Sequence, residues 1–205
     1  MPFLLSGHMN GICVVTPQTP HRKCQGCGLI LEVEPVGLDT EHRATTGDLS
    51  MTSDGFWIAT AKFKRMVEEA DLEGVAFLPL SRKQFVFLPK RAVRLHGGGF
   101  EQEPHGPICD ACGHPKQHTA KSFTLALGRD EVLGRSEIVS AQSNFVMRTI
   151  GKKNLAFFDS PILVGDGVAE ALKGKRLRGL AFVKMVSADI LDAKERDMGG
   201  KDMAG

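Results

Sequence analysis

Two segments of the chain carry the same pattern of apolar and polar positions at an offset of 105 residues. Residues 56–80 and 161–185 align without a gap, and their apolar positions coincide. Four aligned pairs are identical: Leu72 with Leu177, Gly74 with Gly179, Ala76 with Ala181, and Phe77 with Phe182. A shared apolar phase is typical of a repeated structural unit, and chance similarity of two amphipathic segments is the alternative.

The first segment predicts a strand, a helix and a second strand. Residues 56–59 form a short apolar run, and Thr60 is a candidate N-cap for a helix over residues 61–70. Apolar side chains recur in that helix at the spacing of one face. Gly74 marks the exit turn, and residues 75–78 form the second strand.

The second segment predicts the same three elements with a different surface charge. Asp166 is its candidate helix cap and Gly179 its exit turn. Residues 167–185 carry five Lys and Arg against one Glu, whereas residues 62–80 carry three against four acidic residues. Two segments with the same predicted elements but different net charges indicate either that one face is adapted to a partner or that the exposed positions have drifted.

Two copies of a C-x-x-C-G motif add chemistry to this scaffold. They are Cys24-Gln25-Gly26-Cys27-Gly28 and Cys109-Asp110-Ala111-Cys112-Gly113. Two thiolates at this spacing can bind one metal ion, and the final glycine allows the backbone to turn back with positive φ. The four cysteines together predict one structural Zn²⁺ per chain, bound in a closed tetrahedral site by Cys24, Cys27, Cys109 and Cys112.

The long separation of the two motifs requires a folded segment between them. A compact zinc ribbon closes over ~15–20 residues, far fewer than the stretch from Cys27 to Cys109. The alternatives are a pair of redox C-x-x-C motifs or four buried free thiols. Cys13 lies in an apolar run and is expected in the core. The sequence leaves open whether a nearby histidine contributes a ligand: His105, His114 or His118.

We therefore expect an α+β fold, with two related strand–helix–strand units and small β segments joined by a zinc-ribbon-like pair of knuckles. Residues 84–88 and 92–95 are further strand candidates. The chain has 205 residues, of which 42% are hydrophobic, enough for one domain over residues 20–186. Residues 1–19 form an N-terminal segment that could include an extension, and residues 187–205 form a flexible tail.

Charge and motif content limit the classes of function. A net charge of +2 gives no support for strong non-specific nucleic-acid binding. No apolar run reaches the ~20 residues of a membrane span, and cysteines in metal-type pairs favour the reducing cytoplasm. Residues 97–99 lack the lysine of a phosphate-binding loop, no G-x-S-x-G elbow occurs, and a four-cysteine site has no open position for catalysis. We expect no catalytic residues and no enzymatic activity.

The order of these features resembles the double-CXXCG motif family, which includes immunity proteins of bacterial contact-dependent toxin–immunity pairs. The resemblance covers roughly residues 20–186. It rests on both cysteine motifs, Trp57 with the helix after Thr60, Arg94-Leu95-His96, Pro107-Ile108 before the second motif, and Leu177-Arg178-Gly179-Leu180-Ala181-Phe182.

The resemblance implies a non-enzymatic cytoplasmic protein that binds and neutralises a cognate protein toxin. It identifies neither the toxin nor the surface that binds it. The alternative is a zinc-ribbon protein that binds nucleic acid or regulates another molecule, which a near-neutral chain with one tryptophan disfavours. Oligomeric state is open.

Overall fold

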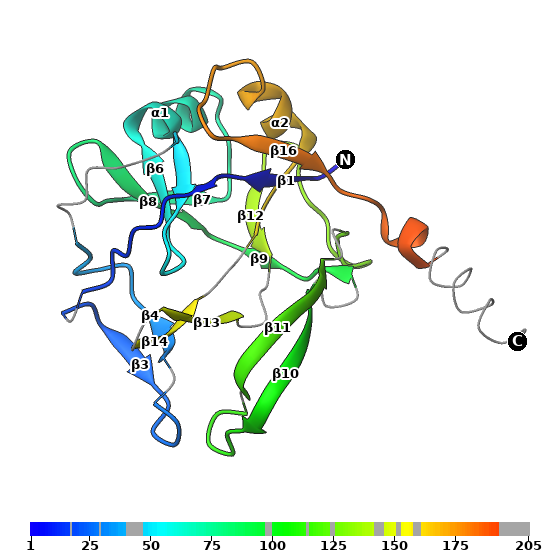
Figure 1. The fold of residues 1–205 in the computed structure, drawn as a ribbon. Helices are drawn as coiled ribbons and strands as arrows, with labels where there is room; N and C mark the ends of the chain where they lie inside the picture. Colours follow the sequence, from blue (N-terminus) through cyan, green and yellow to red (C-terminus); the bar gives the residue numbers. More distant parts are fainter. Residues whose placement is uncertain are drawn as a thin grey trace, which may run out of the picture.

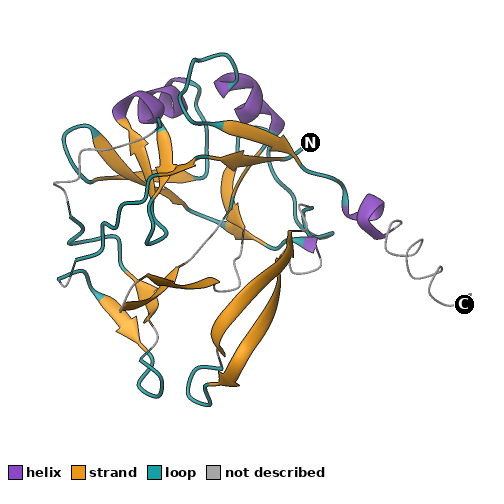
Figure 2. Cartoon of the chain, viewed as in Figure 1, coloured by secondary structure: helices purple, strands orange, loops and turns teal. Residues whose placement is uncertain are grey.

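The fold is a mixture of strands with few helices, as the α+β expectation requires (Figures 1 and 2). The computed structural model describes residues 1–16, 18–28, 30–39, 47–96, 100–113, 115–123, 126–141, 146–150, 153–157 and 161–192. No helix in these ranges is long and apolar enough to cross a membrane. Residues 97–99 and the predicted tail beyond residue 192 lie outside the described residues.

Two five-stranded sheets form the body of the protein. The first has the order β2 (His8–Met9), β5 (Leu49–Met51), β6 (Trp57–Thr60), β8 (Gln84–Pro89), β7 (Val75–Pro79). The second has the order β9 (Ala92–Val93), β12 (Ile138–Ala141), β15 (Ile162–Val164), β1 (Phe3–Ser6), β16 (Ala181–Lys184). In each sheet one edge strand is parallel to its neighbour, and the other described pairings are antiparallel.

The two sheets share one internal arrangement. α1 (Ala61–Glu69) follows β6, and α2 (Asp166–Leu172) follows β15. In the first sheet β8 lies between β6 and the edge strand β7, and in the second sheet β1 lies between β15 and the edge strand β16. Leu5 of β1 pairs with Ile162 and Phe182. Phe87 of β8 pairs with the two residues that stand 105 positions before those two.

The backbone repeats this correspondence after each helix. Gly74 and Gly179, at the predicted exit turns, have φ of 81° and 71°. Asp71 and Arg176, also 105 positions apart, have φ of 50° and 49°, and they are the two described non-glycine residues with positive φ. Asp71 directly follows the C-cap of α1, whereas α2 ends two aligned positions earlier, at Leu172, and is followed by Gly174 with φ of 96°. The shared left-handed residue therefore marks the turn into the next strand, and the two helix ends themselves differ.

The helix starts differ between the two segments. Thr60 is confirmed as the N-cap of α1, since its hydroxyl accepts a hydrogen bond from the Phe63 N–H at 3.2 Å. Asp166 is not the cap of α2, contrary to expectation. The cap position belongs to Gly165, where a Cβ would lie 2.1 Å from the Gly134 carbonyl oxygen. Asp166 is the first helical residue and pairs with the Met1 ammonium at 3.0 Å.

Strand β1 joins the N-terminal residues to the interior of the second sheet. The pattern alone places residues 1–19 before the domain, whereas Leu5 is 1% exposed and lies in the main core. The chain then passes to the first sheet over a single residue, Gly7. A Cβ there would lie 2.7 Å from the Trp57 ring and 2.8 Å from the Leu49 carbonyl oxygen, so only glycine fits this crossing without a shift.

Both sheets and both helices enclose one core. Its buried members include Leu49 from the first sheet, Ile162 from the second, Phe63 from α1 and Val168 from α2. The opposite face of each sheet has a smaller apolar cluster of its own. Figure 1 shows α1 and α2 at the same end of the molecule. The core therefore fixes the two sheets against each other.

Three hairpins project from the end opposite the helices (Figure 1). They are β3 (His21–Lys23) with β4 (Ile30–Val33), β10 (Phe100–Ile108) with β11 (Pro115–Phe123), and β13 (Val146–Ile150) with β14 (Lys153–Phe157). The first two carry the cysteine motifs in their turns. Of the other predicted strands, residues 84–88 correspond to β8, and residues 92–95 form the shorter β9, after which Leu95 bridges to Leu127.

The Arg91–Glu137 ion pair links the entrances of β9 and β12. The Arg91 Nε and Nη2 donate to the Glu137 carboxylate at 2.9 and 3.0 Å. These hydrogen bonds, with help from the Gly134 N–H, hold the pKa of Glu137 below its usual value. A lowered folded-state pKa contributes stability that is present above the unfolded pKa and is lost as the pH falls through the folded one.

We expect Glu137→Gln to lower the free energy of unfolding by about 1 kcal/mol at neutral pH. The difference should shrink as the pH falls through the lowered pKa of the folded-state carboxyl, because the wild-type carboxyl is then protonated too. Urea unfolding at neutral pH and at acidic pH measures it. Glu69→Gln, which removes an exposed ion pair of α1, is the control and should change little. A Glu137→Gln effect that is equal at both pH values would contradict the assignment.

Candidate metal centre

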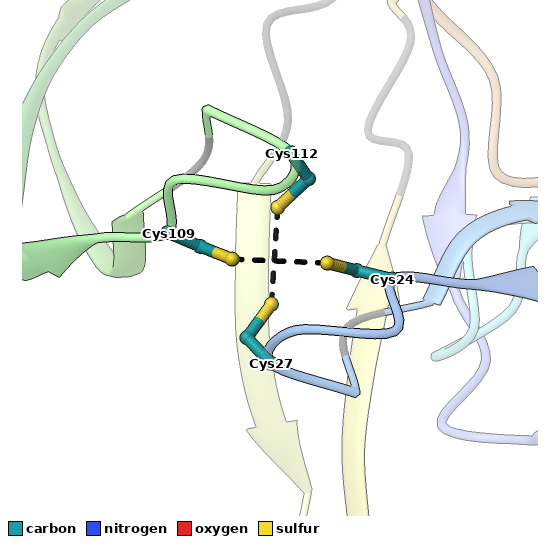
Figure 3. A group of neighbouring side chains, drawn as sticks. All are labelled: Cys24, Cys27, Cys109 and Cys112. Carbon is teal, nitrogen blue, oxygen red and sulfur yellow. Dashed lines mark hydrogen bonds between the residues drawn. The ribbon is translucent and has the colours of Figure 1, made fainter.

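The four cysteines of the two motifs converge on one point (Figure 3). Their Sγ atoms all lie within 4.8 Å of one another. Cys24 Sγ is 3.7 Å from Cys109 Sγ, and Cys27 Sγ is 3.8 Å from Cys112 Sγ. Zn–S bonds of about 2.3 Å in a tetrahedron place neighbouring sulfurs about 3.8 Å apart. The cluster can therefore hold a metal ion, and its donor set and spacing fit Zn²⁺.

Each motif forms the turn of a hairpin. Cys24 follows β3 directly, and Cys109 follows β10 directly. Gly28 donates its N–H to the Cys24 carbonyl at 2.8 Å, and Gly113 donates to the Cys109 carbonyl at 2.7 Å. Both glycines have positive φ, 72° and 69°, as the motif predicts. The two turns are therefore built alike and present their sulfurs to a common centre.

The first motif needs a small residue between its cysteines. A Cβ on Gly26 would lie 2.9 Å from the Ala111 Cβ and 3.3 Å from the Cys109 Sγ. The backbone of Gly26 in the first turn thus packs against the side chains of Ala111 and Cys109 in the second turn, beside the cluster. The motif spacing does not reveal this contact, because it joins residues far apart in the chain, although a glycine between the two cysteines is consistent with it.

The environment of Cys24 favours its thiolate. Hydrogen bonding from the Cys27 N–H, together with the Gly26 N–H and neighbouring thiols, lowers the pKa of Cys24 to about 7, and burial opposes this effect. A thiolate is the form that binds metal. Cys13, by contrast, is half-buried and outside the cluster, and burial and the charge of Asp54 raise its pKa. It stays a thiol.

The surroundings of the cluster favour a structural role over a redox one. A thioredoxin-like pair lies between a strand and a helix, whereas both motifs here lie in turns between two strands. Four sulfur ligands complete the shell of a tetrahedral ion and leave no position for substrate. The side chains of the three histidines considered as further ligands lie outside the described part of the structure: His105, His114 and His118.

Comparisons with protein-family models, with curated proteins and with solved structures found no match for this chain. The cluster is therefore interpreted from its own geometry. Within the described residues it is the one group of three or more His, Cys, Asp or Glu side chains close enough to hold a metal ion.

Replacing Cys109 with serine should remove the metal and destabilise the fold. A site that loses one of four thiolates binds Zn²⁺ poorly, and we expect the free energy of unfolding to fall by roughly 4 kcal/mol or more. Metal analysis of the purified protein and urea unfolding measure both effects. Cys13→Ser is the matched control and should keep about one ion per chain. Retention of the ion by Cys109→Ser would overturn the shared site.

Gly26→Ala should weaken the site by steric conflict alone, since it leaves all four sulfurs in place. We expect roughly tenfold weaker Zn²⁺ binding in a chelator competition. The double variant Gly26→Ala with Ala111→Gly removes the methyl group that the new Cβ would meet, and it should recover most of the affinity. Equal affinity of the single variant and the wild type would show that the turns do not pack as described.

Proposed function

We propose that this protein is a non-enzymatic cytoplasmic binding protein that neutralises a cognate bacterial protein toxin, with one structural Zn²⁺ per chain. The observation that carries the proposal is the four-thiolate cluster. It gathers both C-x-x-C-G motifs, the most specific elements of the family resemblance, into one closed site. A closed site stabilises the fold and leaves function to the protein surface.

We also infer that the chain consists of two related units, larger than the two segments of the sequence pattern. The first runs from β1 and β2 through the first cysteine turn to β5, β6, α1 and β7. The second runs from β8 and β9 through the second cysteine turn to β12, β15, α2 and β16. The strand pairings support this correspondence throughout. The Zn²⁺ would then lie where the same turn of each unit meets its counterpart.

This arrangement supports a binding function in a simple way. Two units that share one core and one metal cluster form a rigid body, and a rigid surface loses little conformational entropy when it binds a partner. The two units need not present the same surface, because their exposed residues differ in charge.

The product of the neighbouring gene is the partner to test first. We expect a stable complex in size-exclusion chromatography and a dissociation constant that depends on Zn²⁺, with Cys109→Ser as the metal-free comparison. Absence of a complex with any co-encoded protein would overturn the proposal. Binding to duplex DNA that weakens steeply with salt would instead support the nucleic-acid alternative.

A further inference from the structure

Strand β16 is an edge strand with unpaired backbone groups. Met185 donates its N–H to the Pro2 carbonyl at 3.1 Å. Hydrogen-bonded and non-hydrogen-bonded pairs alternate along an antiparallel ladder, so the backbone groups of Val183 also face β1. Those of Phe182 and Lys184 face away from the sheet, and no described backbone group pairs with them. They form a template for a further strand.

The corresponding edge of the first sheet is blunted. Leu80 donates its N–H to the Gln84 carbonyl at 3.0 Å, which sets the same alternation in β7 as in β16. The outward position equivalent to Lys184 is therefore Pro79, which opposes Phe85 as Lys184 opposes Phe3. Proline has no N–H, and it is a common protection of sheet edges. Of two equivalent edges, one is protected and the other is open.

The segment that leads into the open edge carries cations without described carboxylate partners. No described Asp or Glu lies within ion-pair distance of the five exposed side chains of this segment and of β16: Lys173, Lys175, Arg176, Arg178 and Lys184. The cations of α1, by contrast, are paired: Lys62 with Asp48, Lys64 with Glu68 and Arg65 with Glu69. This segment and β16 thus carry a net positive charge that no described carboxylate compensates.

An apolar hollow continues the open edge. It has a volume of about 720 Å³ and lies at the end of β16, between Lys184 and the N-terminus. Its lining includes Met1, Val186 and Ile190, which are 60%, 38% and 50% exposed. Large apolar side chains that stay exposed together beside an open edge indicate a binding site.

We propose that β16 is the docking edge for an extended, acidic segment of a protein partner. The segment adds as a strand beside Phe182 and Lys184, its carboxylates face the cations, and an apolar side chain enters the hollow. This inference rests on the proposed function, because it names the surface that its protein partner uses.

Two other occupants fit the edge less well. The outward groups of Phe182 and Lys184 include both N–H donors and C=O acceptors, and a polypeptide strand satisfies both, whereas the phosphodiester of a nucleic acid only accepts. A second copy of this chain, paired through the same strand, would bring two sets of cations together, and like charges across strands are destabilising. An acidic polypeptide meets the hydrogen-bonding and charge requirements at once.

The probe is a capped octapeptide of alternating Val and Glu, titrated into the zinc-loaded, isotope-labelled protein. We expect amide shifts at Phe182 and Lys184 but not in β7, and at least about fivefold weaker binding of the matched Val–Lys peptide. Shifts confined to other surfaces, or equal binding of both peptides, would overturn the inference.

Two substitutions of one residue separate backbone pairing from charge. Lys184→Pro removes the outward N–H and the charge, whereas Lys184→Ala removes the charge alone. Proline should weaken peptide binding about tenfold and alanine only a few fold. Because the Lys184 N–H has no described partner, we expect Lys184→Pro to stay folded. Equal affinities of a folded Lys184→Pro variant and the wild type would overturn the proposal.

A charge reversal gives a second measure should the proline variant not fold. Lys175→Glu with Arg178→Glu should weaken Val–Glu peptide binding about tenfold, whereas Arg65→Glu on α1 should not. The co-encoded protein distinguishes the two proposals. If it binds wild type and these variants equally, β16 is not its docking edge although the proposed function stands. If the peptide binds at β16 but no co-encoded protein does, the proposed function fails and the docking edge stands.

Discussion

The pairing of β1 between β15 and β16 is the constraint on which the rest of this structure depends. It ties residues 3–6 to strands more than 150 positions away and gives the second sheet its interior strand. From there Gly7 connects the chain to β2 in the first sheet. After β8, the chain passes in the opposite direction, from the first sheet to β9 in the second. In the two-unit arrangement that we infer, each sheet contains one strand of the other unit, β8 in the first sheet and β1 in the second, so neither unit completes its sheet alone.

The metal cluster is a consequence of this exchange. The cysteine hairpins, β3–β4 and β10–β11, come next in the chain after β2 and β9, the strands that the chain enters when it passes from one sheet to the other. The crossings place the turns at the same end of the molecule, which brings Cys24 within 3.7 Å of Cys109 although 85 positions separate them. The ion would then bridge the units a second time, far from the shared core. Core and cluster together resist the separation of the two halves at opposite ends.

The features that depend on neighbouring residues in the chain, such as helix starts and turns, are the ones that the sequence pattern predicts. The helix of residues 61–69 begins at Thr60 because a hydroxyl and a helical apolar face suffice to define its start. The exit turns at Gly74 and Gly179 follow from glycine alone. The prediction of Asp166 as the cap of α2 is wrong because the cap position falls on Gly165. The backbone of Gly134 lies so close to Gly165 that a side chain there would clash. The position of β1 inside the second sheet cannot be predicted from its own residues, since a short apolar stretch does not specify which strands will flank it.

The two units differ where their strands end in solvent, and that difference is informative. The two sheets have edge strands at equivalent positions, β7 and β16, and both edges would be open to unwanted pairing with other chains. Pro79 removes one outward N–H from the β7 edge, while Lys184 at the equivalent position of β16 keeps it and adds a charge. A protein gains nothing in stability from an open edge, because its backbone groups are already solvated. Its presence opposite a protected counterpart is therefore better explained by a partner than by the needs of the fold.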